Sequence, residues 1–170
     1  MTEIIIIAAV ARNNTIGSKN TIPWSIREDF QHFKELTMGH PCIMGEVTFE
    51  SLPQKWRPLP GRENIVLTFD KNYHPRGTTI FYDFKDAVAY VKKKAYPKAF
   101  ITGGATIYRL GMEVADTLEL TRINKDIAGD TVFPEIDETR WQLVRREDAQ
   151  GLDRVSGETA SFSFLRYAKR

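Results

Sequence analysis

Asp29 lies among apolar residues in a segment that is typical of an amphipathic helix. Ser25, followed three residues later by Glu28, matches a capping box and predicts where this helix begins. At about 100° per residue, Asp29 falls within the inward-facing stripe of the helix, which is formed by Ile26, Phe30, Phe33 and Leu36. A buried carboxylate is costly unless a partner binds it, whereas an Asp in the first helical turn is favoured by the dipole and can stay half exposed. The segment alone leaves both interpretations open.

A second chemical signal is a pattern that occurs twice, in residues 43–52 and 101–110. Each copy has Ile, Gly two residues later, Thr three after that, an apolar residue and a final Leu. Both copies are typical of a strand, a glycine turn and a helix, which present free backbone N–H groups at the carboxyl edge of a sheet. Thr48 and Thr106 add hydroxyl donors. A glycine pair before a helix is often only a tight turn, but the repetition indicates a site that grips the diphosphate of a dinucleotide.

The elements that must position these residues alternate between strands and helices along the chain. We expect strands at residues 4–10, 41–44, 64–69, 79–81, 98–102 and 118–124, helices at 25–38, 48–52, 84–94 and 105–112, and a closing antiparallel pair at 141–147 and 159–167. A long polar loop, residues 12–25, separates the first strand from the first helix, and its length indicates a function. The pattern predicts one α/β domain over residues 1–170, with a largely parallel central sheet, flanking helices and a C-terminal antiparallel hairpin.

Composition excludes several classes of function. The 170 residues suit one domain, and 24 basic against 22 acidic residues, with no basic block among aromatics, argue against a nucleic-acid partner. Cys42 is the one cysteine, so no internal disulfide is expected, and its spacing from the three histidines matches no metal site. The longest apolar run, residues 4–11, is too short to cross a membrane and lacks a basic leader. We therefore expect a cytoplasmic protein with no membrane partner.

An ordered set of short motifs runs through nearly the whole chain. The set comprises Ile16-Gly17, Ile22-Pro23-Trp24, Asp29 with Phe30 and Phe33, Ile43-Met44-Gly45, Thr48-Phe49-Glu50-Ser51, Arg57-Pro58-Leu59-Pro60-Gly61-Arg62, Gly103-Gly104-Ala105, Tyr108, Leu120-Thr121, Gly129-Asp130-Thr131 and Phe133-Pro134. In this set the chain resembles the bacterial-type, single-domain dihydrofolate reductases. The resemblance implies hydride transfer from a reduced nicotinamide to a dihydropterin carbon, with a proton going to the neighbouring nitrogen.

The resemblance also assigns the catalytic residues. Asp29 would accept two parallel hydrogen bonds from the pterin ring, and an apolar pocket would raise its pKa and suit it to proton delivery. Thr121 would steady Asp29 by hydrogen bonding, although such a residue alone is an ordinary β-branched strand residue. Ile22 and Trp24 would belong to a loop that closes over the site, and Tyr108 would flank the nicotinamide. Asp130 would tie this loop down.

The resemblance implies two sets of binding residues. The substrate is expected to contact Ile7, Ala8, Asp29, Phe30, Phe33, Lys34, Leu52, Arg57, Leu59, Arg62 and Thr102, with Arg62 taking the glutamate carboxylate. The cofactor is expected to contact Ala9, Ile16, Gly17, Gly45, Glu46, Val47, Thr48, Leu67, Thr68, Phe69, Gly103, Gly104, Ala105, Thr106, Ile107, Tyr108 and Thr131. The implied partners are dihydrofolate and antifolate-type inhibitors, and the implied state is a monomer.

Two acidic residues depart from the family pattern where the 2′-phosphate of NADPH is expected. Glu46 follows the glycine of the first crossing, where relatives usually carry Arg or Lys, and Asp70 follows the next strand. A like charge repels a phosphate, and an acidic residue near the adenosine ribose is typical of sites for NAD. The family resemblance predicts NADPH, with Lys71, His74 or Arg76 as compensating cations, and NADH is the alternative cofactor. Thr102 is a further departure, at a position where an apolar residue is common.

Two rival functions differ in what they require of the chain. A reductase of the same fold that acts on a pyrimidine precursor of riboflavin would share the glycine crossings but would not need both Asp29 and Arg62. A nucleotide-binding module without turnover would need neither the closing loop nor the helical carboxylate. The joint presence of these features favours dihydrofolate reduction.

Overall fold

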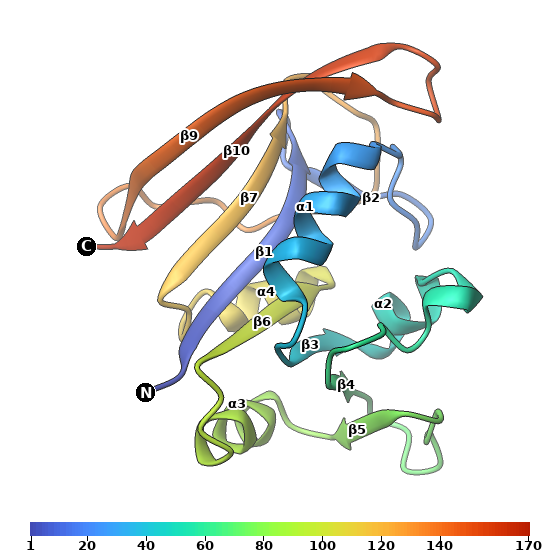
Figure 1. Ribbon diagram of the computed structural model, residues 1–170, viewed down its shortest axis with the longest axis vertical. Helices are drawn as coiled ribbons and strands as arrows, with labels where there is room; N and C mark the ends of the chain where they lie inside the picture. Colours follow the sequence, from blue (N-terminus) through green and yellow to red (C-terminus); the bar gives the residue numbers. More distant parts are fainter.

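The computed structural model describes residues 1–170 and contains one eight-stranded sheet with the order β5-β4-β3-β6-β1-β7-β10-β9 (Figure 1). Strands β1, β3, β4, β5, β6 and β7 pair in parallel, and β10 runs antiparallel to β7 and β9. The strands are β1 (Glu3–Ala11), β3 (Cys42–Gly45), β4 (Asn64–Leu67), β5 (Thr78–Phe81), β6 (Lys98–Gly103), β7 (Thr117–Ile123), β9 (Trp141–Leu152) and β10 (Thr159–Lys169). The predicted α/β class, parallel centre and closing antiparallel pair are confirmed.

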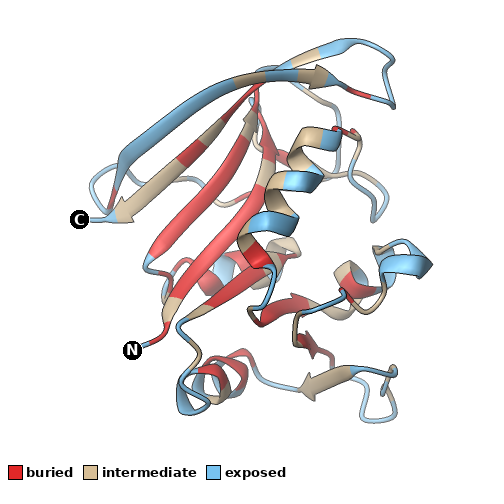
Figure 2. Cartoon of the chain, viewed as in Figure 1, coloured by how far each residue is buried: buried red, intermediate tan, exposed pale blue.

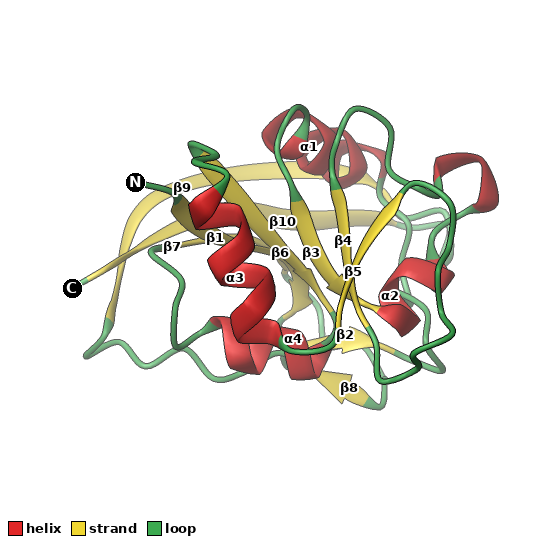
Figure 3. Cartoon of the chain, turned by 90° about the horizontal axis from the view of Figure 1, so that it is seen from below, coloured by secondary structure: helices red, strands yellow, loops and turns green.

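Helices cover both faces of the sheet (Figure 3). They are α1 (Arg27–Thr37), α2 (Glu46–Ser51), α3 (Phe84–Lys93) and α4 (Ala105–Gly111), with a 3-10 turn at Gln54–Trp56. Alternate residues of β1 face different cores: Ile5 and Ile7 pack with the side that carries Phe33, and Ile4 and Ile6 pack with the α3 and α4 side. The predicted two-sided burial of this apolar strand is therefore observed (Figure 2).

The predicted capping box at the start of α1 is wrong. Ile26 is the N-cap residue, and no side chain caps the helix. The backbone N–H of Ser25 donates to Oδ1 of Asp153 at 3.0 Å, so Ser25 is held by the end of the C-terminal hairpin rather than by the helix. The Glu28 carboxylate lies over Gly151, where a Cβ would be 1.9 Å from its Oε2. Contacts distant in sequence have replaced the local cap.

The inward stripe of α1 is only partly as predicted. Ile26 is buried and Phe33 and Leu36 are partly buried, but Phe30 is 49% exposed. Trp24, just before the helix, packs in a separate apolar cluster with β7 and β10 residues.

The long polar loop contains a strand that its sequence did not indicate. Strand β2 (Thr15–Gly17) pairs antiparallel with β8 (Thr131–Val132), more than 100 residues later. The Asp130 carboxylate accepts a hydrogen bond from the backbone N–H of Lys19 at 3.1 Å. The loop between β1 and α1 is thus tied to the segment that follows β7.

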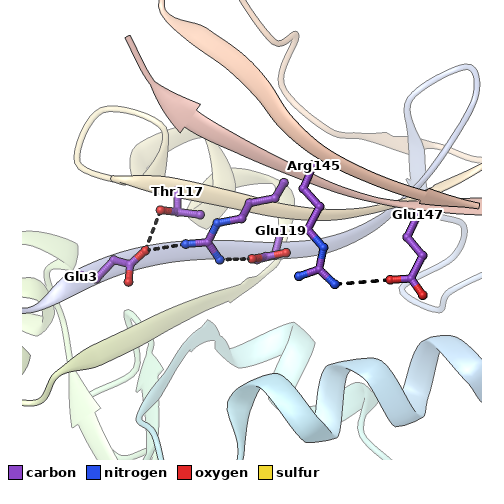
Figure 4. Close-up of polar contacts among 6 residues, drawn as sticks. Glu3, Thr117, Glu119, Arg145 and Glu147 are labelled. Atoms are coloured by element: carbon purple, nitrogen blue, oxygen red, sulfur yellow. Dashed lines mark hydrogen bonds and ion pairs between the residues drawn. The ribbon is translucent and has the colours of Figure 1, made fainter.

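Ion pairs link strand β10 of the C-terminal hairpin to β1 and β7, and a further pair lies within β9 (Figure 4). Arg166 of β10 lies 3.2 Å from Glu3 of β1 and 2.5 Å from Glu119 of β7, and Arg145 lies 3.4 Å from Glu147 within β9. Burial raises the pKa of Glu119, and the Arg166 charge opposes that shift. The Arg166 guanidinium thus compensates the carboxylates of Glu3 and Glu119. No helix in the structure has the length and hydrophobicity needed to cross a membrane.

Candidate active site

A cavity of about 990 Å³ opens where four neighbouring strands reach their carboxyl ends. Its wall includes Ala9 of β1, Gly103 of β6, Gly45 of β3 and Leu67 of β4, in the spatial order of those strands. Crevices at the carboxyl edge of parallel strands are where α/β sheets bind ligands. The parallel sheet thus brings together residues that are far apart in sequence.

The two glycine crossings meet in this cavity. Gly103 has a φ of +124°, which a side chain would strain, and its Cβ would lie 3.3 Å from the Tyr108 hydroxyl. A Cβ on Gly104 would lie 3.3 Å from Oγ1 of Thr48, which belongs to the other crossing. The backbone of β6 and the first turn of α2 therefore approach each other across a gap that only glycine leaves open, as the repeated pattern predicted.

All the residues predicted to bind the cofactor line the cavity. The sequence missed part of its wall: Asn20, Thr21 and Ser51, the β5–α3 junction, and the far end of α4, namely Tyr82, Asp83, Phe84, Lys85, Leu110, Glu113 and Val114. The place of the β5–α3 junction in the wall could have been predicted, because the sequence indicated a strand before it and a helix after it. Lining a cavity does not by itself assign contacts, so the individual binding roles remain predictions.

Asp29 lies in the first turn of α1 and is half-buried. Burial raises its pKa from the ordinary value of 3.8 to about 6, and a hydrogen bond with the Thr121 side chain opposes the shift. Asp29 thus stays half-buried in the first turn, as one of the two interpretations allowed, while burial still dominates the shift of its pKa. A carboxyl group that titrates at this pH can gain and lose a proton under ordinary conditions.

Tyr108 connects the cavity to Asp29. Its hydroxyl donates to the carbonyl of Ile7 at 2.9 Å, and burial raises its pKa, with a further contribution from the Asp29 charge. Tyr108 lines the cavity, as do Ile22 and Thr102. Asp29 itself does not line the cavity, but its charge acts on Tyr108, which does.

Of the residues predicted to bind the substrate, Thr102 lines the cavity and the others lie outside it. Ile7, Leu59, Phe33 and Leu52 pack in one cluster on the α1 side of the sheet, and Ala8 is buried on the other side. Lys34 is exposed on α1. Oγ1 of Thr102 is 3.4 Å from the carbonyl oxygen of Ile43, so its hydroxyl is directed toward the strand β3 backbone.

The two predicted rim arginines are held differently. Nη1 of Arg62 donates to the hydroxyl of Thr37 at 3.1 Å, and its guanidinium lies 6.0 Å from the centroid of the Phe33 ring. Nη1 of Arg57 is 3.2 Å from Oε2 of Glu50 on α2. Arg62 has no carboxylate partner, so its charge is available to an anionic ligand, whereas the Arg57 charge is compensated within the protein.

The loop residues predicted to close over the site differ in exposure. Ile22 is 51% exposed and lines the cavity, whereas Trp24 is buried and its indole Nε1 has no hydrogen-bond partner in the protein. A buried N–H donor without a partner is uncommon. The indole N–H is therefore available to a group that the protein itself does not supply.

The structure also shows where Glu46 and the cations expected to compensate its charge lie. Glu46 lines the cavity and its carboxylate accepts a hydrogen bond from the Thr68 hydroxyl at 2.5 Å. The cations expected to compensate, namely Lys71, His74 and Arg76, do not line the cavity.

The carboxyl edge of this parallel α/β sheet holds a cavity between two glycine crossings, and the Asp29 charge acts on Tyr108 in its wall, an arrangement that fits a nucleotide-dependent oxidoreductase. The family model for dihydrofolate reductase matches residues 3–169. The chain belongs to the dihydrofolate reductase family, and it is an enzyme that reduces dihydrofolate.

Similar proteins span the full length of the chain. Dihydrofolate reductase of Neisseria gonorrhoeae is 41% identical over 167 residues, 98% of either chain, and that of Bacillus subtilis is 36% identical, with 98% of this chain and 95% of the relative covered. A structure of the Enterococcus faecalis enzyme complexed with NADP(H) and RAB-propyl superposes with a TM-score of 0.87 at 29% identity and covers 99% of this chain and 96% of that one. The predicted family, fold and reaction are confirmed, and the riboflavin-pathway alternative is not favoured.

Proposed function

We propose that this chain transfers a hydride from NADPH to 7,8-dihydrofolate and forms 5,6,7,8-tetrahydrofolate, which supplies one-carbon metabolism and the synthesis of thymidylate and purines. The observation that carries this proposal is the position of Asp29 in the first turn of α1, a carboxyl group with a pKa of about 6 whose charge acts on Tyr108 in the cavity wall. Its pKa suits a group that holds a proton and orients a pterin ring.

The cavity residues fit a reduced nicotinamide dinucleotide. Gly103 and Gly104 leave space that a Cβ would fill, and the hydroxyls of Thr48 and Thr106 stand at the starts of α2 and α4. Such a backbone cradle suits a diphosphate, and when bound the cofactor supplies the hydride. Ala9, Ile16 and Tyr108 would place the nicotinamide ring at the β1 end.

On the substrate side, the Asp29 carboxylate would accept two parallel hydrogen bonds from the pterin amino group and ring N–H. Thr121 would steady that carboxylate, and Phe30, Phe33 and Leu52 would contact the rings. Arg62, which has no carboxylate partner, would bind the glutamate tail of the substrate. Ile22 and Trp24 would exclude water once both ligands are bound.

We also propose that the chain acts as a single-domain monomer in the cytoplasm, without a nucleic-acid or membrane partner. One sheet contains strands from both halves of the sequence, which supports a single domain. The free, buried thiol of Cys42 fits a reducing compartment. The near balance of 24 basic and 22 acidic residues gives no strong field for a polyanion.

The test is oxidation of NADPH by the purified protein with 7,8-dihydrofolate, with tetrahydrofolate identified by mass spectrometry. Turnover is expected with dihydrofolate and not with the pyrimidine precursor of riboflavin. Turnover with the pyrimidine alone, or cofactor binding without oxidation of NADPH, would contradict the proposal.

A further inference from the structure

The order of the strands gives the cofactor cavity a direction. Ala9 and Tyr108, whose hydroxyl donates to Ile7 of β1, mark the β1 end, where the proposed function places the nicotinamide ring. The two glycine crossings, at β6 and β3, occupy the middle. The adenosine half of the proposed cofactor is therefore expected at the opposite end. There the wall includes Phe69 and Tyr82, which follow β4 and β5.

Glu46 directly follows the β3 crossing, and its side chain reaches the adenosine end, where Thr68 follows β4. The hydroxyl of Thr68 donates its proton to Oε1 of Glu46 at 2.5 Å, and the same hydroxyl oxygen accepts the backbone N–H of Asp70 at 3.0 Å. No other hydrogen bond engages the Glu46 carboxylate, so its second oxygen is free to accept from a ligand. A fixed carboxylate with a free oxygen on a cavity wall is suited to bind hydroxyl groups.

The charge around Glu46 does not suit a phosphate. No arginine lines the cavity, and Lys85 is its one basic residue, against the acidic side chains of Glu46, Asp83 and Glu113. Lys71 does not line the cavity, and its ammonium lies 3.5 Å from the centroid of the ring of Tyr82, a cavity-wall residue, in a cation–π contact. A phosphate at this end would meet a carboxylate without an arginine fork to compensate it.

We infer that Glu46 is a specificity-determining residue that accepts hydrogen bonds from the adenosine ribose hydroxyls of a non-phosphorylated cofactor. The enzyme then discriminates weakly between the two cofactors and oxidises NADH as well as NADPH. This inference rests on the proposed function and adds a choice of cofactor to it. Thr68 is the positioning residue that presents the carboxylate to the ribose.

The first test compares kcat/KM for NADPH and for NADH, with dihydrofolate saturating, in the wild type, Glu46→Gln and Glu46→Arg. Glu46→Arg replaces repulsion with a phosphate-binding fork, so the NADPH-to-NADH ratio is expected to rise about tenfold or more, and Glu46→Gln should raise it less. Glu135→Arg is the matched control, because Glu135 is exposed, lies outside the cavity and has no ion pair. An equal rise in Glu135→Arg, or no rise in Glu46→Arg, would overturn the inference.

The second test needs no turnover. Calorimetry measures binding of 2′,5′-ADP and of 5′-ADP to the same four proteins, and the preference for 2′,5′-ADP is expected to be small in the wild type and large in Glu46→Arg. Binding that shifts in this way without dihydrofolate reduction would support the inference and contradict the proposed function. A strong wild-type preference for 2′,5′-ADP that Glu46→Arg leaves unchanged would contradict the inference alone.

Discussion

Asp29 and Glu46 are carboxylates at opposite ends of one site, and their surroundings differ. Asp29 lies against apolar side chains, which raise its pKa to about 6, and its neighbour Thr121 only moderates that shift. Glu46 lies at the cavity wall, where the Thr68 hydroxyl holds one of its oxygens. The same chemical group is thus suited to proton transfer at one end and to hydroxyl recognition at the other.

The largest effect is expected at the Asp29 end. Asp29→Asn keeps the shape of the side chain but removes the group that holds the proton, so kcat with dihydrofolate should fall about 100-fold to 10,000-fold. The NADPH-to-NADH ratio of kcat/KM should stay the same, because Asn at position 29 leaves Glu46 unchanged. A change in that ratio, or nearly full activity, would contradict the proposal that Asp29 acts in proton transfer and Glu46 in the choice of cofactor.

Arg62 tests the substrate rim. Arg62→Ala should raise KM for dihydrofolate about tenfold with little change in kcat, since a charge-assisted contact to the substrate carboxylate is lost. A dihydropterin without the glutamate tail is the control, because it should bind equally to both proteins. If this tail-free substrate also loses affinity, Arg62 acts through the fold instead.

The raised pKa of Asp29 predicts how stability depends on pH. The pKa of Asp29 in the folded protein, about 6, exceeds the ordinary value of 3.8. The contribution of its carboxyl group to the free energy of unfolding is therefore present in full below about pH 3.8 and is lost as the pH rises through about 6. Above that pH, Asp29→Asn removes the cost of a half-buried charge. It should add about 1–2 kcal/mol to the free energy of unfolding at about pH 8, after allowance for solvent access, and almost nothing at about pH 3. Thermal unfolding at both pH values measures this, and equal effects at the two would contradict it.

Thr121 should give the smallest effect. Its hydrogen bond lowers the pKa of Asp29, so Thr121→Val should raise that pKa further and move the midpoint of the pH–rate profile to higher pH. Thr117→Val is the matched control on the same strand, because the Thr117 hydroxyl donates to Glu3. Equal profiles for Thr121→Val and the wild type would show that Thr121 does not tune the carboxylate.

The parts of the site that sequence reasoning found are those with local signals. The glycine crossings and the apolar strands carry their pattern within about ten residues, and parallel strands bring their carboxyl ends to one edge. The repeated pattern predicted the glycines Gly45 and Gly103 at the carboxyl edge of the sheet, and the family resemblance predicted the role of Asp29.

The parts that sequence reasoning missed depend on distant partners. Ser25 is held by Asp153, 128 residues away, so a capping box that was correct in pattern did not form. The β2–β8 pair joins residues 15–17 to 131–132, and such short strands carry no periodic signal. The contact of Lys71 with Tyr82 likewise depends on how β5 packs beside β4, and its predicted role in compensating a phosphate stays a prediction.

The most direct test of the account is the rate of hydride transfer in a single turnover, measured with NADPH and dihydrofolate across a range of pH. Because protonated Asp29 is the proposed source of the proton, the wild-type rate should be highest at low pH and decline as the pH rises above about 6. In Asp29→Asn the rate should be low and independent of pH. A wild-type rate that does not change through this range, or a wild-type profile preserved in Asp29→Asn, would contradict the assignment of Asp29.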